Sequence, residues 1–182
     1  MQPVRFAALS VLALMIMSPA LAQSAPDPCE TYPWRLDKEK ILLSEAAGTT
    51  VYAGSYLDRD PPVGFRMKLR PVSGVAFVQT PEGSVSSSGY AGVLKLGSPT
   101  THGAYLVTLS NLAAVDVIQG QGAVPLVDYA VARKCPEVRE SLKFVVNSGS
   151  PLTLQISGAS ENSIDVAITP AWYFNARPPG VP

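Results

Sequence analysis

Much of the chain alternates between apolar and polar residues, which is the pattern of β-strands that bury one face. The clearest example places Phe65, Met67 and Leu69 on one face and basic residues on the other. The expected strands cover residues 65–69, 75–77, 90–96, 105–109, 115–118, 125–131, 142–146, 152–156 and 164–168. The Gly- and Ser-containing segment 157–163 predicts a hairpin turn between the last two strands.

Residues 34–45 have the period of a helix instead. Trp34, Ile41 and Leu42 fall near one face, while the charged residues 37–40 are expected to face solvent. No second helical block follows this segment. The sequence therefore predicts an all-β fold: an antiparallel β-sandwich of jelly-roll or immunoglobulin-like type, with one short N-terminal helix.

The beginning of the chain has the pattern of a secretory signal. Arg5 precedes the apolar residues 6–17, and small residues at 20 and 22 suit a cleavage site before Gln23. The expected organisation is a signal peptide at 1–22, a linker and helix at 23–48, a β-sandwich at 49–170 and a tail at 171–182. We therefore expect a periplasmic or secreted protein with no integral membrane segment once the signal is removed.

Composition and charge narrow the range of functions. The 182 residues are 47% hydrophobic and 15% charged, with no formal net charge, which is typical of a folded globular protein. The balanced charge lacks the basic excess expected of a protein that binds nucleic acid. We therefore expect no nucleic-acid partner.

Cys29 and Cys135 are the two cysteines of the chain. In an oxidising compartment we expect them to form a structural disulfide bond. A redox pair and a pair of metal ligands are the alternatives, but redox pairs usually have C-x-x-C spacing. Closing a loop of roughly 100 residues stabilises a fold by about 4–5 kcal/mol in the chain-entropy model.

Residues that could carry chemistry are few. His102 is the sole histidine and lies in a turn-like segment, where we expect it to be solvated. Serines 86–88 lack the G-x-S-x-G elbow of a nucleophile, and a flexible loop is expected there. Asp58 and Asp60 could contribute to a calcium site, but a turn with mutually paired charges is favoured. We expect no catalytic residue, metal or cofactor.

Four further acidic residues are expected at the surface. Asp116 and Asp165 are single acids on alternating strands, so they should face solvent. Glu137 and Glu140 flank Arg139 and are expected to form local ion pairs. No pair of carboxylates stands out for glycoside hydrolysis.

The C-terminal tail breaks the alternating pattern. Trp172, Tyr173 and Phe174 are consecutive, and three consecutive side chains cannot all face a core from an extended strand. At least one of them should be exposed unless the tail turns sharply or is covered. Because exposed large aromatic residues often mark a contact surface, the three form the candidate binding site of the sequence.

A set of segments spread over most of the chain after residue 22 carries a family resemblance. The segments are GAYLVTLS at 103–110, VDV at 115–117, CPEVRESLKF at 135–144, LTLQISG at 152–158 and IDVAI at 164–168. Together with Cys29 and Trp34, they resemble a family of small periplasmic or secreted β-sandwich proteins of proteobacteria. They are more loosely similar to β-sandwich modules of secreted bacterial proteases and glycosidases. The resemblance implies structural rather than catalytic motifs.

Some members of that family are called homogentisate dioxygenases, an activity that does not suit this chain. A non-haem iron site of that type needs two histidines and a carboxylate, and His102 is the sole histidine.

Three function classes follow from these observations. The first is an exported, non-enzymatic binding module whose partner is an envelope protein or a glycan. The second is an accessory structural protein of the envelope with a protein partner only, and the third is a hydrolase with an unrecognised site. Aromatic residues that could serve a binding surface are Tyr52, Tyr56, Tyr90, Tyr105, Tyr129, Trp172 and Tyr173.

Overall fold

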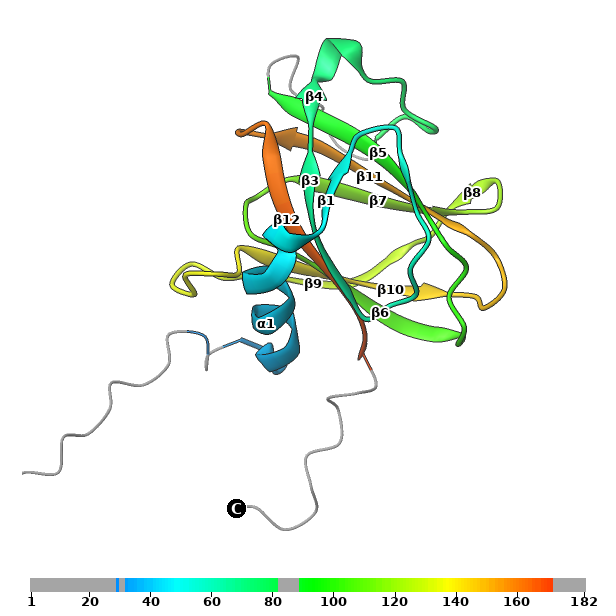
Figure 1. Cartoon of the computed structure of the whole chain (residues 1–182). Coiled ribbons are helices and arrows are strands. Elements are labelled where there is room, and N and C mark those ends of the chain that lie inside the picture. The colour runs from blue at the N-terminus through cyan, green and yellow to red at the C-terminus, as the bar shows by residue number, and fades with distance from the viewer. Residues whose placement is uncertain (1–28, 30–31, 82–88, 172–182) are drawn as a thin grey trace, which may run out of the picture.

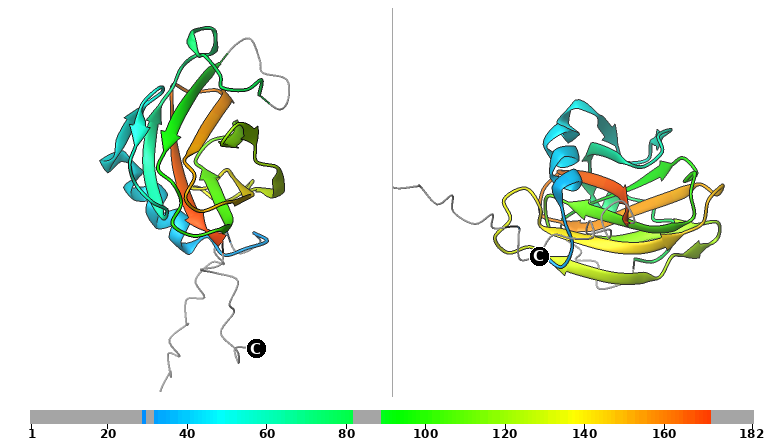
Figure 2. Two further views of the ribbon diagram at one scale, coloured as in Figure 1. Left: turned by 90° about the vertical axis from the view of Figure 1, so that its right-hand side faces the viewer. Right: turned by 90° about the horizontal axis from the view of Figure 1, so that it is seen from below.

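The structure is a computed structural model that describes residues 29, 32–81 and 89–171. Its strands form two sheets, shown in Figure 1 and from two further sides in Figure 2. The first sheet has the order β1-β3-β12-β6-β10-β9, and the second has the order β2-β5-β11-β7-β8, with β4 paired to β5. The prediction of an all-β sandwich is confirmed.

The strands of the first sheet are β1 (Thr50–Tyr52), β3 (Val63–Lys68), β12 (Ser163–Pro170), β6 (Gly103–Leu109), β10 (Glu140–Val146) and β9 (Leu126–Val131). Those of the second are β2 (Tyr56–Leu57), β5 (Tyr90–Leu96), β11 (Leu152–Ala159), β7 (Ala114–Gln119), β8 (Gly122–Ala123) and β4 (Arg70–Pro71). Both sheets are mixed, because β1 pairs in parallel with β3 and β2 pairs in parallel with β5. The expectation of purely antiparallel sheets is corrected at these two short strands.

The core lies between the two sheets. The alternating residues of the long strands point inward, and Phe65, Leu94, Leu109, Ile156 and Val166 are completely buried. Burial of each such side chain stabilises the fold by roughly 1.5–3 kcal/mol. The apolar residues that alternate in the sequence are therefore the ones that pack between the two sheets.

Two local predictions about strands are wrong. Residues 75–77 form no strand; they follow the 3₁₀ turn Val72–Gly74. The next backbone N–H groups, of Val78 and Gln79, donate to the Gln155 side chain at 2.5 and 3.2 Å. The segment therefore lies over β11 without joining a sheet.

The final two strands do not form a hairpin. β11 pairs with β5 and β7 in the second sheet, whereas β12 pairs with β3 and β6 in the first. The turn that joins them carries the chain from one sheet to the other. Turn residues indicate where a chain reverses, but they do not indicate which strand will be its neighbour.

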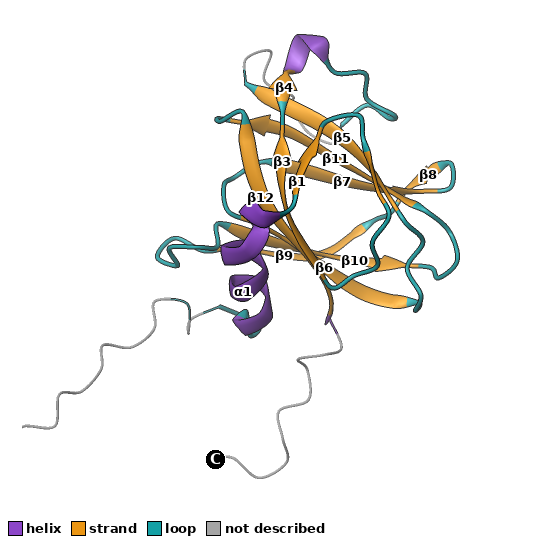
Figure 3. Cartoon of the chain, viewed as in Figure 1, coloured by secondary structure: helices purple, strands orange, loops and turns teal. Residues whose placement is uncertain are grey.

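One α-helix and its 3₁₀ extension lie against the outer face of the first sheet (Figure 3). The helix α1 spans Asp37–Glu45, the 3₁₀ turn spans Ala46–Gly48, and α1 contacts β12 and β3. The packing is close at Gly64, where a Cβ atom would lie 2.4 Å from the Leu42 carbonyl oxygen. A glycine in β3 therefore allows the helix to rest on the sheet backbone.

The predicted orientation of the helix is wrong in part, because Trp34 and Leu42 pack against the buried cluster of this region as expected but two other residues do not follow the prediction. Glu39, expected to face solvent, is completely buried, and Ile41, expected on the packed face, is 58% exposed. The buried apolar residues of this region are Leu36 and Leu43. Glu39 is accommodated because its carboxylate accepts a hydrogen bond from the Thr169 hydroxyl of β12.

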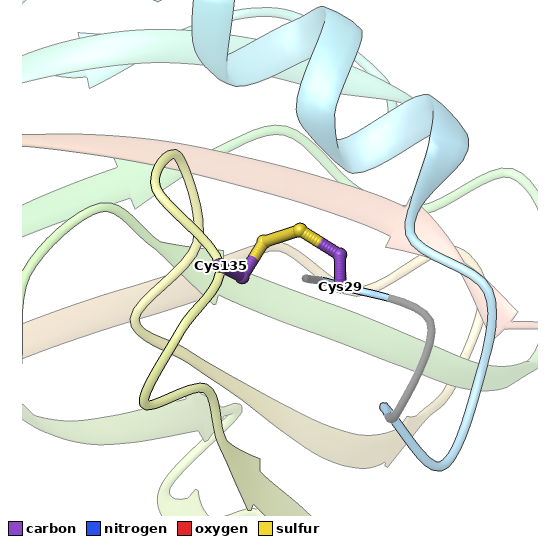
Figure 4. The surroundings of a disulfide bond; sticks show 2 residues. All are labelled: Cys29 and Cys135. Atoms are coloured by element: carbon purple, nitrogen blue, oxygen red, sulfur yellow. A yellow bond between two sulfur atoms is a disulfide. The ribbon is translucent and has the colours of Figure 1, made fainter. Parts of the chain in front are cut away.

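Cys29 and Cys135 form a disulfide bond, which confirms the predicted pairing (Figure 4). Their Cα atoms are 4.8 Å apart, within the usual range for such bonds. The bond ties the segment before α1 to the loop between β9 and β10.

Candidate binding site at the open side of the sandwich

The strand β9 is the last strand of the first sheet, and β10 is its one partner within the described residues. Large apolar side chains on this strand are exposed: Leu126 by 44%, Val127 by 57%, Tyr129 by 64% and Val131 by 46%. Isolated apolar residues at a surface are ordinary, but here four lie within one edge strand of six residues. We call these four residues the edge patch.

A groove of about 270 Å³ lies beside this strand, between the two sheets. Its lining comprises residues 113–117, Ala123, Val124, Leu126, Tyr129, Glu140, Leu142 and Phe144. Leu142 and Phe144 also belong to the core, so the groove reaches the interior of the sandwich. The second sheet ends here in β8, which has only two residues and leaves this side open.

Two acidic residues are among those that line the groove: Glu140, on the inner face of β10, and Asp116, on the outer face of β7. The Glu140 carboxylate is buried and accepts the backbone N–H of Ala113 at 2.7 Å, and its burial raises the pKa of this group. Asp116 is half-buried, and its carboxylate accepts a hydrogen bond from the Gln155 amide at 3.4 Å on the face of the second sheet that points away from the core. None of the described lining residues is basic. The groove is therefore apolar, with an acidic component.

The segment before α1 supports β9 and β10 from the outer face of the sheet. The Tyr32 hydroxyl donates to the Ala130 carbonyl oxygen at 2.5 Å, and burial raises the pKa of Tyr32. The Lys143 ammonium lies 4.6 Å from the centre of the Trp34 ring and 3.5 Å from the Asp128 carboxylate. A hydrogen bond, a cation–π contact and an ion pair thus hold β9 and β10, the strands that carry and adjoin the edge patch, in place.

The disulfide completes this support. Cys135 follows β9 in the chain, and Ala132, Val138 and Cys29 are buried in the same small cluster. Cys29, Cys135 and Glu137 also bring their potential ligand atoms within 4.8 Å of one another. Both sulfur atoms are bonded to each other, so neither is a thiolate ligand in this state.

A second, more polar cleft of about 360 Å³ lies beside α1, and Glu45, Thr49, Arg59 and Asp60 are among its lining residues. In the described part of the chain, the predicted ion pairs among residues 58–60 do not form. Asp58 accepts a hydrogen bond from the Tyr56 hydroxyl at 3.0 Å, and Arg59 donates to the Thr49 hydroxyl at 3.3 Å. Asp58 and Arg59 therefore bond to Tyr56 and Thr49 rather than to each other.

Three of the four surface acids differ from expectation. Asp165 is part of a two-point ion pair with Arg66, at 2.6 and 2.8 Å, between neighbouring strands. Asp116 is half-buried, and Glu140 turns into the groove because it shares the inner face of β10 with Leu142. Glu137 is exposed, as expected.

The remaining predicted sites are either exposed as expected or lie outside the described residues. His102 is exposed in the loop before β6, as expected. Serines 86–88, the aromatic residues Trp172, Tyr173 and Phe174, and the expected signal at 1–22 lie outside the described residues. The predicted roles of these three segments remain predictions.

Comparisons with protein-family models, with curated proteins and with solved structures found no match to this chain. In the part of the chain that the structure describes, no helix is both long enough and apolar enough to cross a membrane.

Sequence reasoning identified residues 125–131 as a strand but missed its position at a sheet edge. Val127, Tyr129 and Val131 alternate with Asp128 and Ala130, which is the pattern of a strand with one apolar face. Such alternation does not show whether a second sheet covers that face, so the sequence carries no signal of the exposed edge.

Proposed function

We propose that this protein is an exported, non-enzymatic binding module of the bacterial envelope that takes a protein partner at the open side of its sandwich. The observation that carries the proposal is the edge patch together with the groove behind it. An exposed apolar patch backed by a groove is typical of an interaction site. The supports from Tyr32, Trp34 and the disulfide keep this site in place before a partner arrives.

Export is supported by two independent features. The apolar segment after Arg5 has the pattern of a cleavable signal, and the Cys29–Cys135 bond suits an oxidising compartment. Expression of the full chain in a bacterium with a periplasm should yield periplasmic protein that begins at Gln23. Recovery from the cytoplasm with an uncleaved N-terminus would contradict export.

Site-specific photo-crosslinking tests the binding site. Tyr129 and Tyr52 are a matched pair, because they are 64% and 65% exposed and lie on the two terminal strands of the first sheet. A photoreactive phenylalanine analogue at position 129 should yield a protein adduct in intact cells, whereas position 52 should not. Adducts from position 52 alone, or from neither position, would contradict the proposed site.

A glycan ligand is the second candidate, and a different surface favours it. Tyr52 and Tyr56 are both exposed, and the Tyr56 hydroxyl bonds to Asp58, which raises the pKa of this tyrosine. Exposed aromatic rings beside carboxylates suit the stacking and hydrogen bonding of sugars. A glycan array would support this candidate if binding is lost in Tyr52→Ala and retained in Tyr129→Ala.

A further inference from the structure

We propose that the partner donates an extended strand that pairs with β9 and continues the first sheet, placing alternate apolar side chains over the groove. This inference rests on the proposed function, since it specifies how the protein partner is recognised. The pairing involves the segment from Asp128 to Val131.

The backbone groups of β9 that face away from β10 can be identified from one hydrogen bond. The N–H of Ala132 donates to the Arg139 carbonyl oxygen at 2.7 Å, toward the β10 side. Because neighbouring residues of a strand direct their backbone groups to opposite sides, Tyr129 and Val131 present theirs at the open edge. The N–H of Tyr129 donates instead to the adjacent Asp128 carboxylate at 2.9 Å. A side chain thus occupies the position that a strand partner would take.

Within the described residues, the second half of β9 lacks the usual protection of an edge strand. Edge strands are commonly shielded by proline, by lysine or by a bulge. Pro125 precedes β9, and the register shifts between Lys143 and Phe144, opposite the beginning of the strand. From Asp128 onward the pairing is regular, and the Asp128 charge is countered by Lys143. The beginning of the strand is protected and its end is not.

The open edge of β9 adjoins the groove, and the two share the inner face of the sheet. Tyr129 and Val131 stand opposite Leu142 and Glu140, which line the groove, so their side chains share the inner face. Side chains of an added strand would alternate in the same way, and every second one would lie over the groove. About 270 Å³ is below the usual size of a pocket for a whole small molecule, but it suits inserted side chains.

The chemistry of the groove limits the sequence of the partner strand. Its floor, formed by Leu142 and Phe144, favours aliphatic or aromatic side chains. Its acid on the inner face is Glu140, and none of the described lining residues is basic. We therefore expect a strand with apolar residues at alternate positions and a lysine or arginine beside them. Main-chain pairing would supply affinity, and these side chains would supply specificity.

Selection from a random peptide library against the oxidised protein is the first part of the test. The selected peptides should show the alternating apolar pattern with a basic residue. The best peptide is then synthesised with its amides N-methylated in two alternating sets. Methylation of the set that faces β9 should weaken binding on the order of 100-fold, because several hydrogen bonds are lost, whereas the other set should have little effect.

The protein side is tested with variants at Val131. Val131→Pro removes an N–H that faces the open edge and should weaken peptide binding by roughly tenfold, whereas Val131→Ala keeps the N–H and most of the affinity. Circular dichroism establishes that both variants fold. If Val131→Pro is unfolded, the N-methylated peptides decide the question on the unchanged protein.

The outcomes separate the two proposals. Selection of no peptide would contradict the proposed function and this inference together. Peptides that bind equally well with either set methylated would overturn strand addition while leaving a protein-binding module in place. Sedimentation that shows a dimer, converted to monomer by Val131→Pro, would make a second copy the occupant and overturn the donated partner strand.

Discussion

The two sides of the sandwich are closed by different means. On one side the chain passes directly from β1 in the first sheet to β2 in the second. The N–H of Ala53 donates to the Lys68 carbonyl oxygen at 2.9 Å, and that of Gly54 donates to the Val93 carbonyl oxygen at 2.7 Å. Backbone hydrogen bonds therefore link this crossing segment to residues of both β3 and β5.

On the other side the chain passes from β8 to β9 with less closure. The N–H of Val124 bonds to the Val117 carbonyl oxygen at 2.7 Å, and beyond this point the groove lies between the sheets. The edge patch follows on β9. Backbone hydrogen bonds thus connect the two sheets on one side, whereas on the other side they end early and leave the groove of the candidate binding site.

The largest expected effect comes from the bond that supports the open side. Replacing both cysteines, Cys29→Ser with Cys135→Ser, should lower the free energy of unfolding by about 4–5 kcal/mol in the chain-entropy model. Urea denaturation of the oxidised protein and the variant measures the difference. Hydrogen exchange should increase in β9 and β10 more than in β1 and β3. A loss below about 1 kcal/mol would contradict a structural role for the bond.

A smaller loss of stability is expected from replacing a glycine by alanine, and one such glycine lies on each side of the sandwich. A Cβ atom at Gly92 would lie 2.6 Å from the Met67 methyl group and 3.0 Å from the Ala53 Cβ, whereas one at Gly122 meets nothing within 4 Å. Gly92→Ala should therefore lower the free energy of unfolding by about 1–3 kcal/mol. Gly122→Ala, the matched change on the open side, should alter it by less than about 0.5 kcal/mol. Equal effects would show that the two sides are equally crowded.

Much of the fold could be predicted from the sequence because strands record their environment in every second residue. Phe65 and Met67, for example, alternate with basic residues and are buried as expected. The cysteine pair was likewise predictable, since only one pairing exists. Short strands such as β2 and β8 have two residues each, too few to show a period.

The candidate site could not be predicted because it depends on contacts between distant segments. The alternation of residues 152–156 and 164–168 indicates two strands, but only their neighbours decide that they belong to different sheets. A glutamate is usually expected at the surface, and the position of Glu140 in the groove follows from the register of β10. Glu39 is similar: the helix period locates a face, but Thr169 supplies the partner that permits a buried carboxylate.

That carboxylate gives a pH-dependent prediction for the covered face of the first sheet. Burial raises the pKa of Glu39, while the hydrogen bond from Thr169 partly opposes the rise. The folded protein therefore takes up a proton at a higher pH than the unfolded chain does. Relative to Glu39→Gln, the wild type should gain stability as the pH falls from neutrality through the raised pKa, and the gain should be complete below the usual value near 4.5.

Chemical denaturation of both proteins at several pH values measures this difference. Glu140→Gln tests the same effect on the open side, because burial also raises the pKa of Glu140, and it should shift the pH dependence of stability in the same direction. Parallel stability curves for wild type and Glu39→Gln would show that Glu39 titrates alike in the folded and unfolded states.

Little effect on stability is expected from a change within the edge patch, and this prediction tests the difference between the two sides most directly. Val51 and Val131 lie on the two terminal strands of the first sheet, and they are 8% and 46% exposed. Threonine has nearly the same shape as valine but adds a hydroxyl group. Val51→Thr should lower the free energy of unfolding by about 1–3 kcal/mol, because that hydroxyl is buried. Val131→Thr should change it by less than about 0.5 kcal/mol, because solvent reaches the side chain. Urea denaturation of both variants makes the comparison. A large loss of stability in Val131→Thr would mean that the edge patch contributes to folding. This result would contradict the proposal that the open side is a surface for a partner.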